Sequence, residues 1–367
     1  MFINRIIPKN YTKHRVESAI GILKGFSQGF ANGDLYENDI IDIVDEILKA
    51  NNLTVPEIMA EIGLGCEDYL KRYRFGMNVF ECSLNNCTEW RNIRSIYGVC
   101  CTFNFNPNDL SQSVVSNDWG KHSGVSIILD GKMVTKSGFN TFVHNVAEYL
   151  TKSTSIISLL PGYDNFIRVR PQFNIPSQHF LSLPFESRRC FLPQDRNLTL
   201  FQQSRCQNME FGMAIRNECG CHPYFLPQFD NAENTTENCT IQDIRCFKYD
   251  SAFWNHISSD CFPSCHDLFY RLTTSQTMLQ SHATVMTLYK NITQSNASHI
   301  FSAHIFYGVH NVKVLKWILV ITWLDLISNL GGILNLTLGI SVISVFEVIY
   351  YCIYKPIQFI RKHDIVV

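Results

Sequence analysis

The sequence predicts an α+β fold, in which a disulfide-rich extracellular domain is followed by one transmembrane helix. Thirteen of the 14 cysteines lie before residue 300, and an apolar segment, 331–354, lies near the C-terminus. Ahead of that segment, a helical hydrophobic pattern gives way to strand-like patterns. The 367 residues exceed one ordinary domain, and the net charge of −1 gives no global field of the kind that marks a nucleic-acid-binding protein.

Residues 14–65 predict helices. In the segment 39–52, DIIDIVDEILKANN, apolar side chains recur at positions 40, 41, 44, 47 and 48, which is a helical period. Thr54 precedes Val55 and Pro56, and this order is typical of an N-cap with proline in the first helical turn.

Residues 100–180 predict strands. Short runs rich in apolar and β-branched residues are bounded there by Gly, Asn or Pro. The runs are 100–105, 124–131, 138–145 and 165–177. A further run, 304–314, is expected to be the last strand before the membrane segment.

A cluster of eight cysteines predicts disulfides formed in an oxidising compartment. Its members are Cys190, Cys206, Cys219, Cys221, Cys239, Cys246, Cys261 and Cys265. Zinc is the alternative, but the paired CxxC spacing of a zinc knot is missing from the sequence. The count alone allows 105 pairings of eight cysteines.

Glycosylation motifs indicate the same compartment. Eight N-x-S/T sequons precede the membrane segment, at Asn10, Asn52, Asn86, Asn197, Asn234, Asn238, Asn291 and Asn296. A ninth, at Asn335, lies within the apolar region and is expected to be unused.

The segment 331–354 has the length of a membrane-spanning helix. Sixteen of its 24 residues are apolar, and Glu347 carries its one formal charge. Lys355, Arg361 and Lys362 follow it and favour a cytoplasmic C-terminus. The sequence therefore predicts an extracellular domain over 1–320, a pre-pore and membrane segment over 321–354, and a cytoplasmic tail over 355–367.

Two features distinguish this segment from a plain anchor. Small or polar residues recur on one helical face, at Ser328, Gly331, Gly332, Asn335 and Gly339. Such a face is often only a helix-packing surface, but an amide is costly against lipid and tolerated against water or a partner helix. Glu347 is ionisable at membrane depth, which indicates a functional site unless its side chain reaches back to the cytoplasmic interface.

The run Gly339-Ile340-Ser341 resembles the G-x-S selectivity motif of the degenerin/epithelial sodium channel family. A glycine pair lies eight residues upstream and Glu347 eight downstream of Gly339, as in that family. The longer string SVISVFEVIYYCIYKP is most similar to the insect pickpocket branch.

This resemblance implies that three such helices line a pore and that the G-x-S residues form its constriction as a short extended break. The selectivity filter would then be Gly339, Ile340 and Ser341, with Glu347 attracting cations below it. Ser328 falls at the degenerin position, where a small side chain permits the gate to close. Gly332 and Asn335 complete the gate region, and Asn335 departs from the glycine of most members.

The segment 206–227 resembles the thumb motif of the family, with Glu210 where its second cysteine belongs. CFPSC, 261–265, resembles a second motif whose first cysteine is replaced by Ser259. In the family those two missing cysteines bond to each other, so one whole bridge is lost. The pairs implied are Cys190–Cys265, Cys206–Cys261, Cys219–Cys246 and Cys221–Cys239. They would staple thumb helices near 199–217 and 273–289.

The implied architecture is a helical finger over 14–65, a β-sheet palm over 100–180 and a cysteine-rich thumb over 190–290. The implied function is a subunit of a stimulus-gated, amiloride-sensitive channel that passes Na⁺ across the plasma membrane as a homo- or hetero-trimer. No cofactor, metal or nucleic acid is expected, and neither HExxH nor G-x-S-x-G indicates an enzyme. The alternatives are a single-pass receptor or a non-conducting subunit, and the stimulus is not readable.

The N-terminal residues MFINRIIPKNYTKHR contain no apolar run, so the first membrane helix of the family is expected to be missing. The odd count of thirteen cysteines agrees with a lost partner. Cys100 or Cys101 is the expected orphan, and the pairing of Cys66, Cys82, Cys87, Cys100 and Cys101 stays open.

Overall fold

The chain forms two compact units in the structure, which is a computed structural model. The larger comprises Met1–Ile175 and Phe185–Leu315, and the smaller Pro176–Pro184 and Lys316–Val367. The structure describes residues 12–27, 38–82, 87, 89–107, 109–133, 138–192, 195, 202–226, 237–246, 261–279, 288, 297–339 and 341–363.

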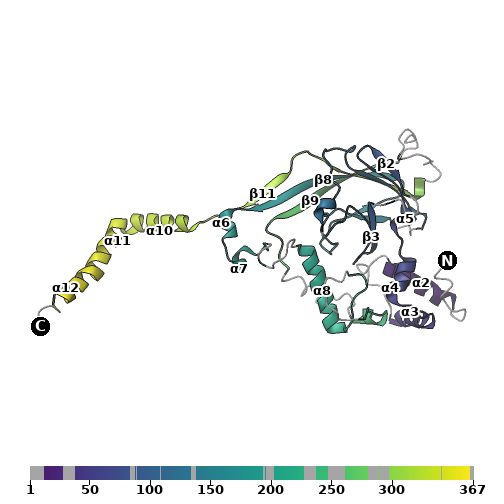
Figure 1. The fold of residues 1–367 in the computed structure, drawn as a ribbon, viewed down its shortest axis with the longest axis horizontal. Coiled ribbons are helices and arrows are strands. Elements are labelled where there is room, and N and C mark those ends of the chain that lie inside the picture. Colours follow the sequence, from purple (N-terminus) through teal and green to yellow (C-terminus); the bar gives the residue numbers. More distant parts are fainter. Residues whose placement is uncertain are drawn as a thin grey trace. The chain divides into compact units, whose positions relative to one another are not determined.

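A seven-stranded sheet is the centre of the larger unit (Figure 1). Its strands are β1 Leu70–Phe75, β2 Asn78–Glu81, β5 Val125–Asp130, β8 Tyr163–Pro176, β9 Asp267–Met278, β10 Ile300–Tyr307 and β11 Lys313–Trp317. The order is β11-β8-β10-β5-β1-β2, and β9 pairs with β8 off this path. β8 and β10 are parallel, whereas β5 pairs antiparallel with both β1 and β10. The predicted strands 124–131 and 165–177 coincide with β5 and β8.

Two short hairpins accompany the sheet. They are β3 Trp90–Ser95 with β4 Gly98–Phe103, and β6 Phe139–Phe142 with β7 Ile156–Leu159. Their apolar side chains pack with one face of the sheet in a cluster that includes Tyr73, Ile127, Leu159 and Phe301. Because side chains alternate along a strand, the neighbours of these residues project to the opposite face.

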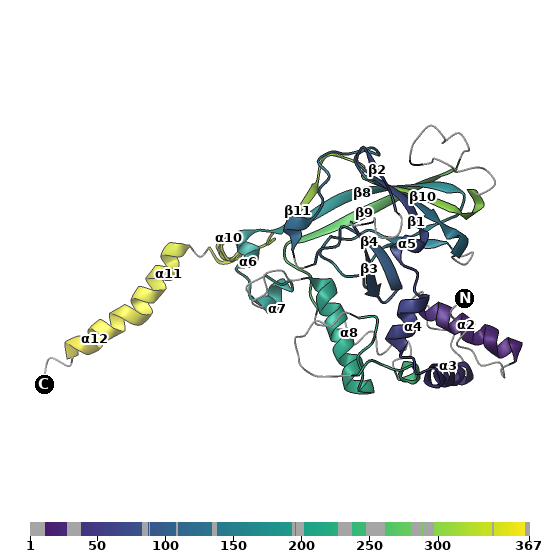
Figure 2. The same ribbon diagram turned by 45° about the vertical axis from the view of Figure 1, so that its right-hand side comes forward.

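The helices of the larger unit lie on one side of the sheet in both ribbon views (Figure 2). They are α2 Lys13–Ser27, α3 Asn38–Ala50, α4 Val55–Ile62, α5 Cys66–Tyr69, α7 Phe185–Arg188 and α8 Gln203–Cys219. α3 matches the predicted helix 39–52. At the start of α4, the backbone N–H and the hydroxyl of Thr54 both donate to Glu57 Oε2, each at 2.8 Å.

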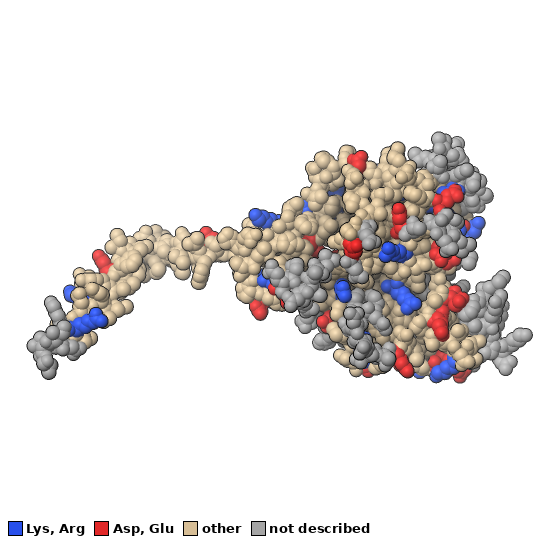
Figure 3. Space-filling view, viewed as in Figure 1, with Lys and Arg blue, Asp and Glu red and all other residues tan. Residues whose placement is uncertain are grey.

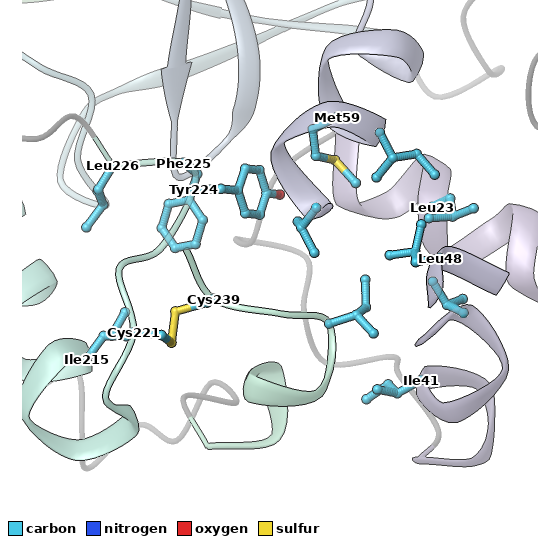
Figure 4. Close-up of a cluster of buried hydrophobic side chains, with 14 of the residues drawn as sticks. Leu23, Ile41, Leu48, Met59, Ile215, Cys221, Tyr224, Phe225, Leu226 and Cys239 are labelled. Atoms are coloured by element: carbon cyan, nitrogen blue, oxygen red, sulfur yellow. A yellow bond between two sulfur atoms is a disulfide. The ribbon is translucent and has the colours of Figure 1, made fainter. Parts of the chain in front are cut away.

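A second apolar core joins helices that are far apart in the sequence. Leu23 of α2, Ile41 of α3 and Ile58 of α4 are fully buried with Ile215 of α8. Figure 4 shows Phe225 and the Cys221–Cys239 disulfide in the same cluster. The amphipathic helices of 14–65 therefore bury their apolar faces against the cysteine-rich part of the chain.

Six disulfides tie the larger unit together. The structure contains the four pairs that the resemblance implied, Cys190–Cys265, Cys206–Cys261, Cys219–Cys246 and Cys221–Cys239. It adds Cys66–Cys101 and Cys82–Cys87, the two pairs that the sequence left open. Cys100 and Cys352 are free, so the orphan in the larger unit is Cys100. Glu210 lies beside the Cys206–Cys261 sulfurs, where the fifth bridge of the motif is lost, and Ser259 lies outside the described residues.

The second predicted thumb helix, 273–289, is wrong over 273–278. These residues belong to β9, which pairs with β8 without interruption from Tyr163↔Met278 to Asn174↔Asp267. Thr273, Thr274 and Thr277 are β-branched and favour a strand, and the long β8 ladder satisfies their backbone groups. The remainder of that range, apart from 279 and 288, lies outside the described residues.

The predicted strand 304–314 is also two elements. β10 ends at Tyr307, and β11 begins at Lys313. Gly308 and Asn311 lie in the turn between them, and these residue types interrupt a strand.

Candidate functional site

The smaller unit carries an interrupted helix. α10 spans Trp323–Leu338, α11 spans Val342–Ile349, a π-helical turn covers Tyr350–Tyr354, and α12 spans Lys355–His363. The chain leaves the helix between Leu338 and Val342, at the Gly-x-Ser run where the resemblance implied a short break. Among the described residues, one helical stretch, Val342–Arg361, is long and apolar enough to cross a membrane by length and composition.

Gly339 ends α10. Its backbone is left-handed, with φ 64° and ψ 17°, and its N–H donates to the Asn335 carbonyl at 2.9 Å. Glycine adopts this conformation without the steric cost that a Cβ imposes. The last carbonyls of α10 consequently lack partners within their own helix.

Ser341 begins α11. Its backbone is extended, with φ −102° and ψ 168°, and its hydroxyl accepts from the Ser344 N–H at 3.3 Å. In return, the Ser341 N–H donates to Ser344 Oγ at 3.4 Å. The two ends of the Gly-x-Ser run therefore act locally as a helix stop and a helix start. Ile340 lies outside the described residues.

At the break, the carbonyl end of α10 is followed within a few residues by the N–H end of α11. The carbonyl end of a helix carries a partial negative charge, and free carbonyl oxygens there favour a cation. Carbonyl oxygens are also the groups with which many filters replace the water around an ion. The end of α10 can therefore offer oxygen ligands without any formal charge.

The face predicted upstream of the break lies on one continuous helix. Ser328, Gly332 and Asn335 follow one another at steps of four and three in α10, so they share a face. A Cβ added at Gly331 or Gly332 would meet nothing within 4 Å. Among the described residues of the smaller unit, packing does not require these two glycines.

Capping fixes the start of α10. The Thr322 N–H and hydroxyl both donate to Asp325 Oδ2, at 2.9 and 2.6 Å, and the Asp325 N–H donates to Thr322 Oγ1 at 3.3 Å. This reciprocal box satisfies orphan donors of the first turn. The helix that carries Ser328 therefore begins at a defined residue.

No described residue of α10 or α11 is buried. Trp323 is 75% exposed, Leu336 89% and Val342 73%. On the face drawn in Figure 3, the surface over these helices is almost free of charged atoms. An apolar surface of this extent is unfavourable in water, so lipid or partner chains must cover it.

α11 continues the polar face below the break. Glu347 lies three residues after Ser344, which lies three after Ser341, so the three side chains follow one side of the helix. The sequence reasoning named Ser341 and Glu347 but missed Ser344, although the three-residue spacing was visible.

Aromatic side chains follow Glu347. Tyr350 stacks on Tyr354 with ring centroids 5.6 Å apart, and Lys355 Nζ lies 4.9 Å from the Tyr351 ring centroid. Tyrosine and lysine together are typical of a membrane–water interface.

The predicted glycosylation sites fall only partly within the described residues. Asn238 is exposed at the surface of the larger unit. Asn197, Asn234 and Asn291 lie outside the described residues.

The sequence is similar to known channel proteins over most of its length. The sequence profile of the family described as "Amiloride-sensitive sodium channel" matches residues 10–351. The chain is 23% identical to "Sodium channel protein Nach" of Drosophila melanogaster, over 95% of this chain and 69% of that protein. It is 24% identical to "Pickpocket protein 28" of the same organism, over 82% of this chain and 58% of that protein. It is also 24% identical to "Degenerin del-1" of Caenorhabditis elegans, over 84% of this chain and 47% of that protein.

Proposed function

The chain belongs to the amiloride-sensitive sodium channel family, and on that premise we propose that it is a subunit of a stimulus-gated, amiloride-sensitive channel that passes Na⁺ across the plasma membrane. The observation that carries the proposal is the helix break at Gly339–Ser341. It lies in a segment whose large apolar side chains are exposed in the single chain.

One chain cannot enclose an ion pathway with a single interrupted helix. The open space beside Gly331 and Gly332 and the exposed α10–α11 surface support assembly with further copies or related subunits. Small residues allow helices to approach closely in a membrane. We assign this assembly as a homo- or hetero-trimer, following the resemblance of the pore segment.

In this assembly the Gly339, Ile340 and Ser341 of each subunit form the selectivity filter. The carbonyl oxygens at the end of α10 replace part of the hydration shell of Na⁺. Glu347, on the face of α11 that also carries Ser341, attracts cations and raises their concentration near the filter. The role of the larger unit is to convert an extracellular stimulus into movement of α10.

The gate is assigned to the face of α10 that carries Ser328, Gly332 and Asn335. A small side chain at Ser328 permits close approach of the helices in the closed state, whereas a branched side chain would hold them apart. The Ser328→Val variant is therefore expected to conduct without a stimulus.

The test is to express the full chain alone and with related family subunits and to record amiloride-sensitive Na⁺ current. We expect Ser328→Val to raise constitutive current about tenfold, the effect of about 1.4 kcal/mol on a closed–open equilibrium. Thr337→Val is the matched control, because Thr337 lies on the opposite face of α10 from Ser328. The Thr337 hydroxyl donates to the Ile333 carbonyl at 2.8 Å.

Surface biotinylation separates the outcomes. Normal surface delivery without current in any combination would overturn the conducting role and leave a non-conducting subunit or a single-pass receptor. Equal currents in the Ser328 and Thr337 variants would remove the gate assignment alone.

A further inference from the structure

We propose that the larger unit contains a binding site for a small, uncharged and mainly apolar molecule, in a cavity between the sheet and its two hairpins. Binding at this site does not depend on conduction, so its test is separate from that of the proposed function. Three features support the inference: the volume of the cavity, its aromatic lining and the absence of charged side chains from the described lining.

The cavity has a volume of about 310 Å³. One wall is the apolar face of the sheet, with Ile127 of β5, Val169 of β8 and Ile305 of β10. Aromatic side chains of the hairpins form the other side, namely Trp90, Phe103, Phe139 and Phe142. Both hairpins and the sheet belong to the larger unit, so one compact body builds the whole site.

The cavity is partly open to the surface of the larger unit, so a small molecule can enter it. Small-molecule sites begin at about 300 Å³ and are lined mainly by apolar and aromatic side chains. A dry apolar cavity of about half this volume is already sufficient to bind benzene.

The described lining contains no Lys, Arg, Asp or Glu. His144 is the one lining group that titrates near neutral pH, and burial lowers its pKa, so it is uncharged at pH 7. The arginines of β8, Arg168 and Arg170, alternate with Val169 and therefore project from the opposite face of the sheet. A charged ligand would lose its hydration here without gaining a counter-charge.

The polar groups of the lining are largely engaged within the protein. Asn104 Nδ2 donates to the Val114 carbonyl at 2.9 Å, and Asn104 Oδ1 accepts from the Val114 N–H at 2.8 Å. The hydroxyls of Tyr270 and Tyr307 share a hydrogen bond. Among the described lining residues, Trp90 Nε1 is buried without a hydrogen-bond partner and can offer one donor. Recognition otherwise comes from apolar and aromatic contact, which selects an uncharged ligand with a large apolar surface.

The experiment uses benzophenone as the probe, since its two phenyl rings are joined by a photoreactive carbonyl without charge. The purified full-length chain in detergent is irradiated with benzophenone, and adducts are located by peptide mass spectrometry. 4-Benzoylbenzoate is the matched charge control, because it carries the same chromophore and one carboxylate. We expect saturable benzophenone adducts on peptides of β4, β6 and β10, and at least tenfold fewer with 4-benzoylbenzoate.

Two neighbouring valines supply the matched variants. Val114 lines the cavity, whereas Val115 is 70% exposed and is not part of the lining. Val114→Trp fills the cavity and should reduce labelling at least fivefold, and Val115→Trp should leave it unchanged. Val143→Trp fills the cavity from the chain after β6 and serves if Val114→Trp fails to fold.

Adducts confined to residues 323–363 would show partition into the detergent only and would overturn the proposal. Equal labelling by benzophenone and 4-benzoylbenzoate would also overturn the proposal. So would unchanged labelling in both Val114→Trp and Val143→Trp. Saturable labelling of the cavity in a chain that passes no current would support the site and leave the channel function to its own test.

Discussion

Glu148 shows how burial controls a single ionisable group in the larger unit. Burial, with the nearby Asp267 carboxylate, raises the pKa of Glu148 to about 7, and its N–H donates to the Asn145 carbonyl at 2.9 Å. A carboxyl whose pKa is raised in the folded state contributes stability below its unfolded pKa. That stability is lost as the pH rises through about 7.

Glu148→Gln should therefore stabilise the protein at alkaline pH. We expect the free energy of unfolding at pH 8 to rise by about 2 kcal/mol, because the variant removes a buried charge. The advantage should disappear toward pH 5, where both side chains are neutral in the folded state. Urea unfolding across this pH range measures the effect, with the exposed Glu61→Gln as control. An equal gain at pH 5 and pH 8 would contradict the assignment to charge.

At the scale of the element, α8 contains two glycines with opposite backbone requirements. Gly220 ends the helix in a left-handed conformation, with φ 73°, and its N–H donates to the Arg216 carbonyl. Gly212 lies in the helix interior, where an added Cβ would meet Leu226 Cδ1 at an ordinary 3.5 Å. The same substitution should therefore have opposite effects at the two positions.

Gly220→Ala should destabilise the protein by about 1 kcal/mol, because alanine pays the cost of the left-handed region. Gly212→Ala should stabilise it by up to about 1 kcal/mol, the difference in helix propensity between the two residues. Thermal unfolding of the two variants beside the parent chain measures both values. A loss of stability in both would show that the space beside Gly212 is tighter than the contact distance indicates.

The elements also show where sequence patterns were sufficient. The apolar period of 39–52 and the Thr54 cap predicted α3 and the start of α4, because both signals are local. The threonines of 273–278 are a weaker local signal for a strand, and the pairing with β8 is what makes the segment part of β9. A strand is stabilised by a partner that can lie a hundred residues away, so a single segment does not reveal it.

At the scale of the whole molecule, the cysteines, the sequons and the basic C-terminus agree on one orientation. The disulfide-bonded larger unit is expected outside the cell, and Lys355 and Arg361 after the membrane segment inside it. Asn238 is exposed on the larger unit, whereas Asn335 lies in α10.

Asn238 should consequently carry a glycan in a secretory-pathway host. Asn238→Gln should remove one glycan, so the variant should run faster than the parent chain on a denaturing gel. After treatment with a glycosidase, the two proteins should run alike. Asn335→Gln should leave the glycan count unchanged if α10 lies within the membrane, as the predicted pre-pore and membrane segment 321–354 requires, because the transferase cannot reach it there. A mobility shift for Asn335→Gln would place α10 on the extracellular side and revise the membrane boundary.

The sequence by itself predicted the family, an oxidising compartment, the helix at 39–52, the start of α4 and the motif Gly339-Ile340-Ser341. Each of these depends on residue types at short spacing or on a resemblance in the string. The tertiary structure alone decided which cysteine stays free, since Cys66 bonds Cys101 and leaves Cys100. The resemblance implied a break at the Gly-x-Ser run, but the folded backbone alone shows how it is made, with a left-handed Gly339 and an extended Ser341. The cavity beneath the sheet belongs to the same category, because its walls come from strands that only the fold brings together.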